Sequence, residues 1–427
     1  MNKQSIAFRL YQLTILLLAP ILVIVFLIRS ISQKEYRQRM TERFGWLPSR
    51  MRTGGIVVHA ASVGEVIAVK PFVEQLLIQY PDLPITVTTF TPTGSAQVKR
   101  FFLNKVQHCY LPLDISFCVH LFFRLLQPKA LVLMETELWP TLIHRCHKSQ
   151  VKIMLINGRL SAKSLKGYKK LTPLITPALN KFDAILCQSA DNAHHFVEMG
   201  AEQSIVHNSG NLQYDIHVTE AVESKIAELK QQLPAGRKVV VVGSTHQGEE
   251  KHAIEAYKKL KPQHPDLLLV LVPRHPERFD RVADICLQHE LNVARRSQSD
   301  AVESTDDVWL IDTLGELLAT YSFADVCIVA GSFSDIGGHN PLEAALFAKP
   351  IIVGTNMANF KDINDKFLDA NGIVQLEDNI HLAEKLHVLL TDKELAESIG
   401  KNGHDVVRQN QGATQASINK LAALLDQ

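Results

Sequence analysis

The chain has 427 residues, more than one hydrophobic core usually supports, so two domains are expected. Its composition, 46% hydrophobic and 21% charged, is that of a globular protein and excludes a disordered chain. The formal net charge of +1 provides no broad basic footprint, so nucleic acid is not an expected partner. Six scattered cysteines without a CxxC pair are typical of reduced residues in a cytosolic body.

The first element in chain order is an apolar segment. Residues 10–28 carry no charge and are about long enough to cross the hydrocarbon core of a bilayer. A cleavable signal peptide is the alternative, but no clear small-residue cleavage site follows. Five basic residues follow the segment and two precede it, so the positive-inside rule places everything downstream in the cytoplasm. We expect residues 1–30 to anchor the chain, either by crossing the membrane or by lying in one leaflet.

Short β-branched runs then alternate with helical stretches over residues 31–215, the first predicted domain. This alternation is typical of a parallel sheet covered by helices on both faces, which binds ligands beyond the carboxyl ends of its strands. Four strands end in specific polar loops, which packing alone does not explain. The expected strands are Ile56–His59, Ile85–Phe90, Ala130–Met134, Lys152–Ile156 and Ala184–Cys187, and the loops are His59–Glu65, Thr91–Ser95, Glu135–Pro140 and Asn157–Ser161.

The alternation of predicted strands and helices stops near residues 216–236, which we interpret as a linker containing a charged helix. A second series of strands and helices occupies residues 237–427 and ends in helices. The last of these helices could pack against the first domain. The predicted fold class is therefore α/β, with two doubly wound, Rossmann-like domains facing a cleft. The second set of expected strands is Val239–Gly243, Leu267–Val272, Val308–Ile311, Ala324–Ala330 and Ile351–Gly354.

A glycine-rich stretch, Gly331–Phe347, follows a buried strand in the second domain. Asn340 suits a helix N-cap, Pro341 the first helical position and Glu343 the third. A strand, a glycine turn and a capped helix form a phosphate cradle, with Glu343 placed for ribose hydroxyls. An ordinary capped turn between a strand and a helix is the alternative interpretation.

Three carboxylates in the first domain are candidates for acid–base chemistry. Glu65 follows a glycine at a predicted helix start, where a carboxylate can take a proton from a sugar hydroxyl or merely complement the helix dipole. Glu135 and Glu137 end a strong strand, where one can assist in the transition state while the other caps the next helix. The alternation of side chains along a strand does not decide which of the two faces the site.

Arg274 lies at a strand end in the second domain and offers a planar fork for phosphate or carboxylate, with a surface salt bridge as the alternative. Thr313, Gly315 and Glu316 form another polar loop. The sequence has no GxxxxGK[ST] loop, no GxGxxG and no histidine spacing typical of metal sites. We therefore expect neither a metal nor a redox cofactor.

Six segments taken together resemble the 3-deoxy-D-manno-octulosonic acid (Kdo) transferase family, in order along the chain. The resemblance implies a glycosyltransferase B (GT-B) fold and an inner-membrane enzyme of lipopolysaccharide assembly that moves Kdo from CMP-Kdo to lipid IVA. It places the lipid acceptor on the first domain and the nucleotide on the second. The six segments are His59–Glu65, Thr89–Ser95, Met134–Pro140, Asn157–Ser161, Val272–Phe279 and Gly337–Glu343.

The resemblance also implies roles for individual residues. Glu65 takes the place of the general base and Glu135 that of a carboxylate assisting in the transition state. The implied contacts to CMP are Pro273, Arg274, Leu314, Gly315, Glu316, Asn340, Pro341, Leu342 and Glu343.

One position departs from the family pattern. Gln213 stands where the family has a lysine that stabilises the transition state, so an amide replaces a positive charge. The stretch Phe333–Ile336 also lacks a basic residue expected before the paired glycines. Two alternatives therefore stay open: a glycosyltransferase of the same fold with another donor, and a membrane-tethered binding protein with weakened catalysis.

Overall fold

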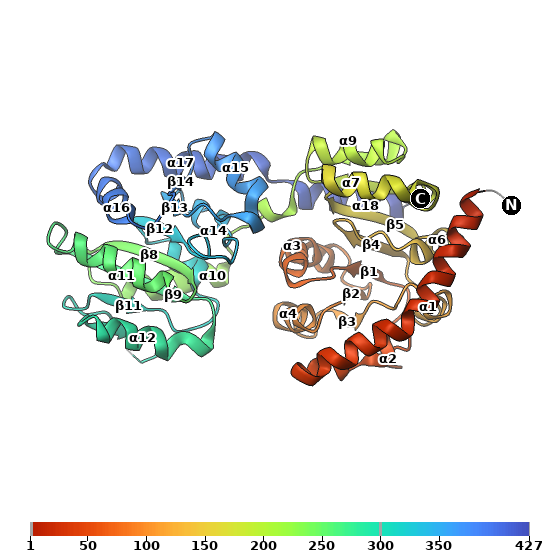
Figure 1. Cartoon of the computed structure of the whole chain (residues 1–427), viewed down its shortest axis with the longest axis horizontal. Helices are drawn as coiled ribbons and strands as arrows, with labels where there is room; N and C mark the ends of the chain where they lie inside the picture. The colour runs from red at the N-terminus through yellow and green to blue at the C-terminus, as the bar shows by residue number, and fades with distance from the viewer. Residues whose placement is uncertain (1–2, 299–300, 427) are drawn as a thin grey trace. The chain divides into compact units, whose positions relative to one another are not determined.

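The computed structural model describes residues 3–298 and 301–426, which form two α/β units (Figure 1). The first unit comprises the chain up to Asp215 and from Asn410 on, and the second is Ile216–Gln409. Met1 and Asn2, the first residues of the predicted anchor, and Gln427 lie outside the described residues.

The first unit is built on a seven-stranded, all-parallel sheet with the order β3-β2-β1-β4-β5-β6-β7. Both faces are buried, because Leu131 and Leu133 of β4 join one core cluster while Val132 and Met134 join the other. Five strands match the predicted ones, whereas β3 and β7 are short edge strands with polar residues and were not predicted. The strands are β1 (Ile56–His59), β2 (Ile85–Thr89), β3 (Gln107–Tyr110), β4 (Ala130–Met134), β5 (Lys152–Gly158), β6 (Ala184–Cys187) and β7 (Val206–Asn208).

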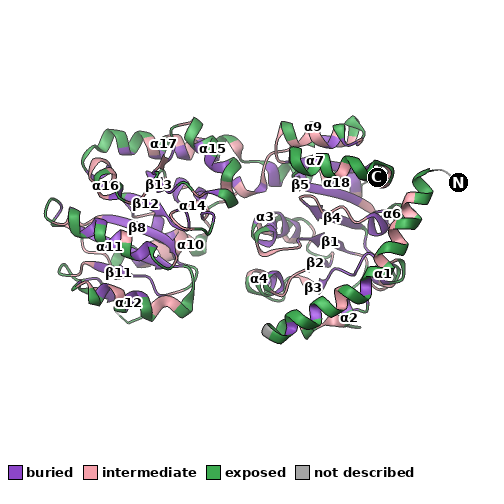
Figure 2. Ribbon diagram, viewed as in Figure 1, coloured by how far each residue is buried: buried purple, intermediate pink, exposed green. Residues whose placement is uncertain are grey.

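Helices cover both faces of this sheet (Figures 1 and 2). They are α1 (Lys3–Ser32), α2 (Met40–Arg43), α3 (Val63–Gln79), α4 (Pro92–Phe102), α5 (Ser116–Leu126), α6 (Pro140–Lys148), α7 (Ala162–Tyr168), α8 (Thr172–Leu179), α9 (Ala190–Glu198) and α18 (Ala413–Leu425).

The second unit repeats the plan with a parallel sheet of order β10-β11-β9-β8-β12-β13-β14. Five of its strands were predicted, and β10 and β14 are again short edge strands. The strands are β8 (Lys238–Thr245), β9 (Leu267–Pro273), β10 (Val293–Arg295), β11 (Val308–Leu310), β12 (Val326–Val329), β13 (Ile351–Val353) and β14 (Val374–Gln375). The helices are α10 (Glu220–Gln231), α11 (Glu249–Leu260), α12 (Phe279–Gln288), α13 (Leu317–Tyr321), α14 (Leu342–Ala345), α15 (Lys361–Asp369), α16 (Leu382–Thr391) and α17 (Lys393–Asn410).

Two segments differ from the predicted domain boundaries. The predicted linker, residues 216–236, contains α10, which contacts α13 and belongs to the second unit. Residues 410–427, which the boundaries placed in the second domain, belong to the first unit, since α18 contacts α3 and β5. Asp215 accepts the backbone N–H of Gly412 at 2.6 Å, so the first unit itself holds the start of this returning helix.

The order of strands reverses once in each sheet. In the first unit the chain runs outward in one direction from β1 and in the other from β4, and in the second unit the corresponding pair is β8 and β12. The place between these two strands is the topological switch point of each sheet. The connections that follow the two strands run to opposite faces of the sheet, which opens a crevice at the carboxyl ends of the strands. The loops after β1 and β4, and after β8 and β12, are therefore where ligand sites are expected.

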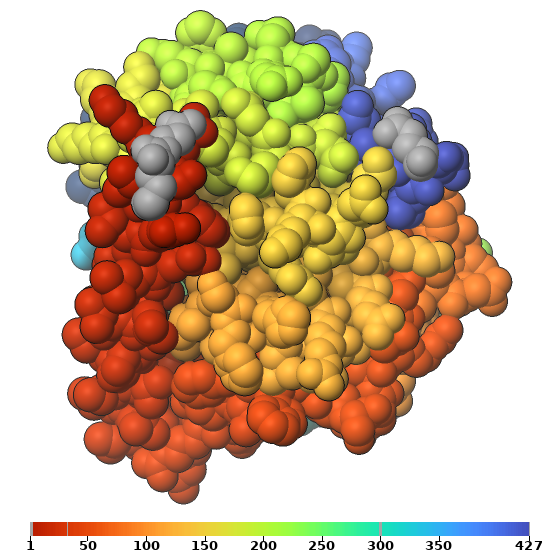
Figure 3. Space-filling view, turned by 90° about the vertical axis from the view of Figure 1, so that its right-hand side faces the viewer, coloured from red at the N-terminus to blue at the C-terminus, as the bar shows by residue number. Residues whose placement is uncertain are grey.

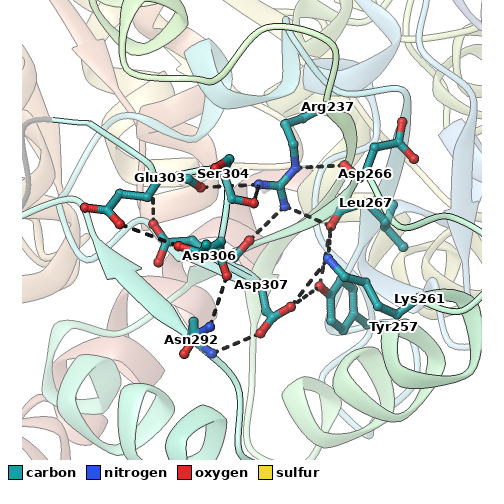
Figure 4. A network of polar contacts seen from close by, with 11 residues as sticks. Arg237, Tyr257, Lys261, Asp266, Leu267, Asn292, Glu303, Ser304, Asp306 and Asp307 are labelled. Carbon is teal, nitrogen blue, oxygen red and sulfur yellow. Dashed lines mark hydrogen bonds and ion pairs between the residues drawn. The ribbon is translucent and has the colours of Figure 1, made fainter.

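The amino ends of the second sheet are closed by polar contacts (Figure 4). The Arg237 guanidinium donates to the backbone oxygens of Asp266 and Leu267 at 2.7 and 2.9 Å, and to those of Glu303, Ser304 and Asp306. Tyr257 donates to the Asp307 carboxylate at 2.7 Å, which Lys261 also approaches at 3.4 Å. These contacts fix the loop before β11 at the edge opposite to the crevice, so we assign them to stability.

Helix α1 lies along the flank of the first unit (Figure 3). Tyr11 donates to the Asp114 carboxylate at 2.8 Å, and Gln12 donates to Ser116 at 2.7 Å. Near the other end, the buried Arg43 guanidinium lies 4.4 Å from the centre of the Phe26 ring. The segment Lys3–Ile31 is long and apolar enough to cross a membrane, and most of its large apolar side chains are exposed.

Candidate active site and nucleotide site

Glu65 lies at the switch point of the first unit, in the first turn of α3. Ser62 caps this helix, and the Glu65 carboxylate accepts the backbone N–H of Ala61 and the hydroxyl of Ser62, both at 2.9 Å. Burial raises the pKa of Glu65 above its usual value, and these two hydrogen bonds oppose the shift. The residue is therefore both a capping glutamate and a carboxylate with increased basicity, so the two alternatives from the sequence are not exclusive.

Glu135 follows β4 directly, on the other side of the same switch point. Its φ of 52° is in the left-handed region, which is uncommon for a residue with a side chain and clusters at functional sites. Burial and the negative charge of Glu65 raise the pKa of Glu135 to about 7, while Arg159 opposes the shift. The structure thus brings Glu65 and Glu135 close enough to couple electrostatically.

Glu137 has a different environment from Glu135. Its carboxylate accepts the indole N–H of Trp139 at 2.6 Å and lies 3.5 Å from Nε2 of the buried His59. Burial acts to raise the pKa of Glu137, but the hydrogen bonds and the charge of His59 outweigh it and lower the pKa. Glu137 is therefore held by its neighbours, which leaves Glu135 as the less constrained carboxylate of the pair.

Gln213 lies in η4 (Leu212–Tyr214), which contacts α3, the helix that carries Glu65. Asn157, at the end of β5, accepts the backbone N–H of Leu212 at 3.0 Å. Asn211 accepts the backbone N–H of Gln213 at 2.9 Å. Two asparagine side chains therefore fix the backbone that presents Gln213 to this end of the sheet.

The paired carboxylates give a prediction about stability and pH. Because the pKa of Glu135 is raised in the folded state, that state binds more protons than the unfolded chain between about pH 4.3 and 7. The free energy of unfolding should therefore decrease as the pH rises through this window, by on the order of 1–3 kcal/mol. Glu135→Gln should remove the share of this decrease that Glu135 contributes, as measured by chemical unfolding in detergent at pH 5 and pH 8.

The control for that experiment is Glu202→Gln, since Glu202 is an exposed glutamate of the same unit. It should keep the full dependence of the unfolding free energy on pH. An equal dependence in wild type, Glu135→Gln and Glu202→Gln would contradict the environment assigned to Glu135.

In the second unit, the loops after β8, β9 and β12 meet at one edge. The backbone N–H of Arg274 donates to the carbonyl of Thr245 at 3.1 Å, which holds the end of β9 against that of β8. The Glu249 carboxylate accepts the backbone N–H groups of Gly331, at 2.7 Å, and of His246, at 3.0 Å. This buried carboxylate, absent from the predicted site, fixes the glycine-rich loop to α11.

Arg274 and its neighbour Arg278 have different roles. Arg278 donates through two nitrogens to the buried Glu250 carboxylate, at 2.8 and 3.0 Å. Arg274 is exposed, and among the described residues no hydrogen bond or ion pair engages its guanidinium. The described residues therefore form no salt bridge with Arg274, and its planar fork is available to an anion.

Glu343 lies in α14, which is a single turn from Leu342 to Ala345 and shorter than the predicted helix. Asn340 accepts the backbone N–H of Leu342 at 3.1 Å, as a capping residue does, although the helix begins one residue later than predicted. Burial raises the pKa of Glu343 to about 7, and the charge of Arg274 opposes the shift. Pro341 and Leu342 are buried.

The third loop of the predicted nucleotide site follows β11. Its carboxylate, Glu316, lies 3.2 Å from both Arg296 and Lys225, and these ion pairs anchor the loop. Gly315 has a φ of 87°, and Leu314 is exposed. Because α13 follows this loop and contacts α14, the loop lies on the same side of the sheet as Glu343.

Among the described residues, no group of three or more His, Cys, Asp or Glu side chains is arranged to hold a metal ion. Pro273 is buried at the end of β9 and positions Arg274. His246 was not among the predicted site residues, although it follows the end of β8, and that position was the available signal. His339 lies in the glycine-rich stretch that predicted a nucleotide site, but it was given no contact of its own.

Two doubly wound units, each with polar loops at its switch point, define the class of GT-B proteins. The fold resembles UDP-GlcNAc 2-epimerase from Neisseria meningitidis, at 13% identity and a TM-score of 0.56, covering 87% of this chain and 100% of that one. It also resembles a glycosyltransferase from Rickettsia africae ESF-5, at 12% identity and a TM-score of 0.55, covering 87% and 99%.

Sequence comparison identifies the family within that class. The N-terminal family model, "3-Deoxy-D-manno-octulosonic-acid transferase", matches residues 38–216, and "Glycosyl transferases group 1" matches residues 226–406. The chain is 36% identical to 3-deoxy-D-manno-octulosonic acid transferase from Haemophilus influenzae, covering 98% of this chain and 99% of that protein. The chain therefore belongs to the Kdo transferase family.

Proposed function

We propose that the protein transfers Kdo from CMP-Kdo to lipid IVA, a step of lipopolysaccharide assembly. The observation that carries the proposal is the coupled pair of Glu65 and Glu135, which lies at the switch point of the first unit and has raised pKa values. A carboxylate of increased basicity beside a second carboxyl group suits removal of a proton from a sugar hydroxyl.

Glu65 acts as the general base in this proposal. Its carboxylate takes the proton of the acceptor hydroxyl, the hydroxyl oxygen forms a bond to the anomeric carbon of Kdo, and the bond from that carbon to the phosphate oxygen breaks. The departing electron pair stays on CMP. A direct displacement of this kind inverts the anomeric centre, and Glu135 interacts with the positive charge that develops on the sugar.

The second unit holds the donor. Arg274 donates two parallel N–H groups to the phosphate. Its positive charge stabilises the negative charge that develops on the leaving CMP, without a metal ion. Glu343 accepts ribose hydroxyls, and the backbone from Asn340 to Leu342 and of Leu314–Glu316 completes the nucleotide contacts. Gln213 donates a hydrogen bond in the first unit, where a charged residue would also contribute an electrostatic attraction.

The protein is proposed to act at the cytoplasmic side of the inner membrane. Support comes from the apolar α1 and from the distribution of charge, which the overall net charge of +1 conceals. The first unit contains 25 Lys and Arg against 14 Asp and Glu, a net charge of +11. The second contains 20 against 30, a net charge of −10. A basic unit bearing the anchor suits an anionic membrane and a phosphorylated lipid acceptor.

A donor-competition experiment tests this function. Detergent-solubilised protein is incubated with lipid IVA and either CMP-Kdo or a UDP-activated sugar, and the released nucleotide is measured with and without EDTA. The proposal predicts release of CMP that depends on lipid IVA and is insensitive to EDTA. Release from a UDP-sugar alone, or loss of release with EDTA, would contradict the assigned donor or the metal-independent displacement.

A further inference from the structure

Three histidines converge at the switch point of the second unit. His246 follows β8, His275 follows β9, and His339 lies in the glycine-rich loop after β12. Nε2 of His246 and Nε2 of His339 are 2.8 Å apart, and the two rings are nearly parallel, with an interplanar angle of 5°. The His275 ring centre lies 5.3 Å from that of His246.

The backbone is shaped to admit this pair. Gly331 has a φ of 73°, and a Cβ atom placed there would lie 2.8 Å from Cδ2 of His339. A side chain at residue 331 would therefore displace the His339 ring. On the other side, Glu249 accepts the backbone N–H groups of both His246 and Gly331, so one buried carboxylate fixes the two loops that carry the pair.

A hydrogen bond between two imidazole nitrogens constrains the protonation of the pair. One Nε2 must carry a hydrogen and the other must accept it, so the neutral pair can take up one proton on a remaining nitrogen and keep the bond. A second proton would leave two N–H groups facing each other and break it. The pair is thus built to hold either no added proton or one.

Burial and the neighbouring cations disfavour protonation of the pair in the free protein. Burial lowers the pKa of His339 to about 4, and Arg274, His246 and His275 add to the shift. Burial also lowers the pKa of His246, with contributions from His275, Arg278 and Arg274, whereas Glu250 opposes them. An anion bound at Arg274 would oppose these shifts, because its negative charge offsets the cation and favours a protonated imidazole.

We propose that the His246–His339 pair takes up one proton when the phosphate of the donor nucleotide binds beside Arg274, and keeps it while the leaving group departs. This inference rests on the proposed nucleotide donor. Cleavage of the sugar–phosphate bond increases the charge of the phosphate from −1 to −2, and the positive imidazolium then stabilises the second negative charge. The acceptor proton goes separately to Glu65.

Calorimetric titration of CMP into the full-length protein tests the proposal. The protons taken up are obtained by repeating the titration at pH 7 in buffers of different ionisation enthalpy. We expect wild type to take up a substantial fraction of one proton per CMP, and His246→Gln and His339→Gln to lose that uptake. Glutamine keeps a hydrogen-bonding group near the position of Nε2 but does not titrate, so folding and much of the CMP affinity should remain.

The dependence of affinity on pH provides a second readout. Uptake of a proton makes binding tighter at low pH, so wild-type affinity should fall by about threefold to tenfold per pH unit above pH 6.5 relative to the variants. Taking this difference cancels the ionisation of CMP itself and of Glu343, which both proteins share. His381→Gln is the matched control, because His381 is exposed and pairs with Asp378 away from the cluster.

The outcomes separate this inference from the function on which it rests. CMP binding without proton uptake in wild type, or with equal uptake in His246→Gln and His339→Gln, would overturn the proton-uptake role and leave the nucleotide site standing. Absence of CMP binding to folded wild-type protein would overturn both. Unfolding temperatures of the variants show whether a lost response reflects a lost fold.

Discussion

Glu65→Gln is expected to lower Kdo transfer by about 10²–10⁴-fold while leaving CMP affinity unchanged. The reason is local, because the amide cannot take the acceptor proton but can still act as a cap. Its oxygen accepts the backbone N–H of Ala61, and its NH₂ group donates to the Ser62 hydroxyl in place of the present bond. Initial rates of transfer and calorimetric titration of CMP give the two quantities.

The matched control is Glu74→Gln on the same helix. Glu74 forms an i,i+4 pair with Lys70 at 3.3 Å and is partly exposed, so its loss should change neither the rate nor the CMP affinity. Transfer at close to the wild-type rate in Glu65→Gln would remove Glu65 from the role of base.

Arg274→Ala should weaken CMP binding by about 10–100-fold, the loss expected for hydrogen bonds from a charged donor to phosphate. Since the Arg274 side chain has no hydrogen bond or ion pair within the described residues, its removal should leave the stability of the second unit unchanged. Arg274→Lys should recover only part of the affinity, because an ammonium group cannot reproduce the planar fork. Titration with CMP and thermal unfolding measure the two effects.

Arg281→Ala is the control for this variant, since Arg281 is an exposed arginine on α12 of the same unit. It should bind CMP as wild type does. Equal affinity in Arg274→Ala and Arg281→Ala would show that the free guanidinium of Arg274 does not contact the phosphate.

Central strands were predictable because both of their faces are buried, which produces unbroken apolar runs such as Ala130–Met134. The edge strands β3, β7, β10 and β14 were not, because an edge position needs only a few residues and tolerates polar ones such as those of Gln107–Tyr110. Strand order, and with it the switch points, depends on contacts between distant segments that local periodicity does not encode.

The candidate site likewise has features that could be predicted from the sequence and features that could not. Glu135 and Arg274 follow strands directly, and Glu65 lies in the first turn of the helix after β1, so their position at the functional edge could be expected from the parallel sheet. The side-chain environment could not be predicted. Arg296, which anchors Glu316, directly follows β10, an edge strand that was not predicted. The contact of His246 with His339, across 93 residues, likewise appears only when β8 and β12 become neighbours.

Mass spectrometry of the lipid product tests the central claim most directly. Full-length protein in detergent is incubated with CMP-Kdo and lipid IVA, with Glu65→Gln as the inactive comparison. The account predicts a product heavier than lipid IVA by one or more Kdo residues in wild type and its loss in the variant. Unmodified lipid IVA from a wild-type protein that is folded and binds CMP would contradict the assigned acceptor and the reaction.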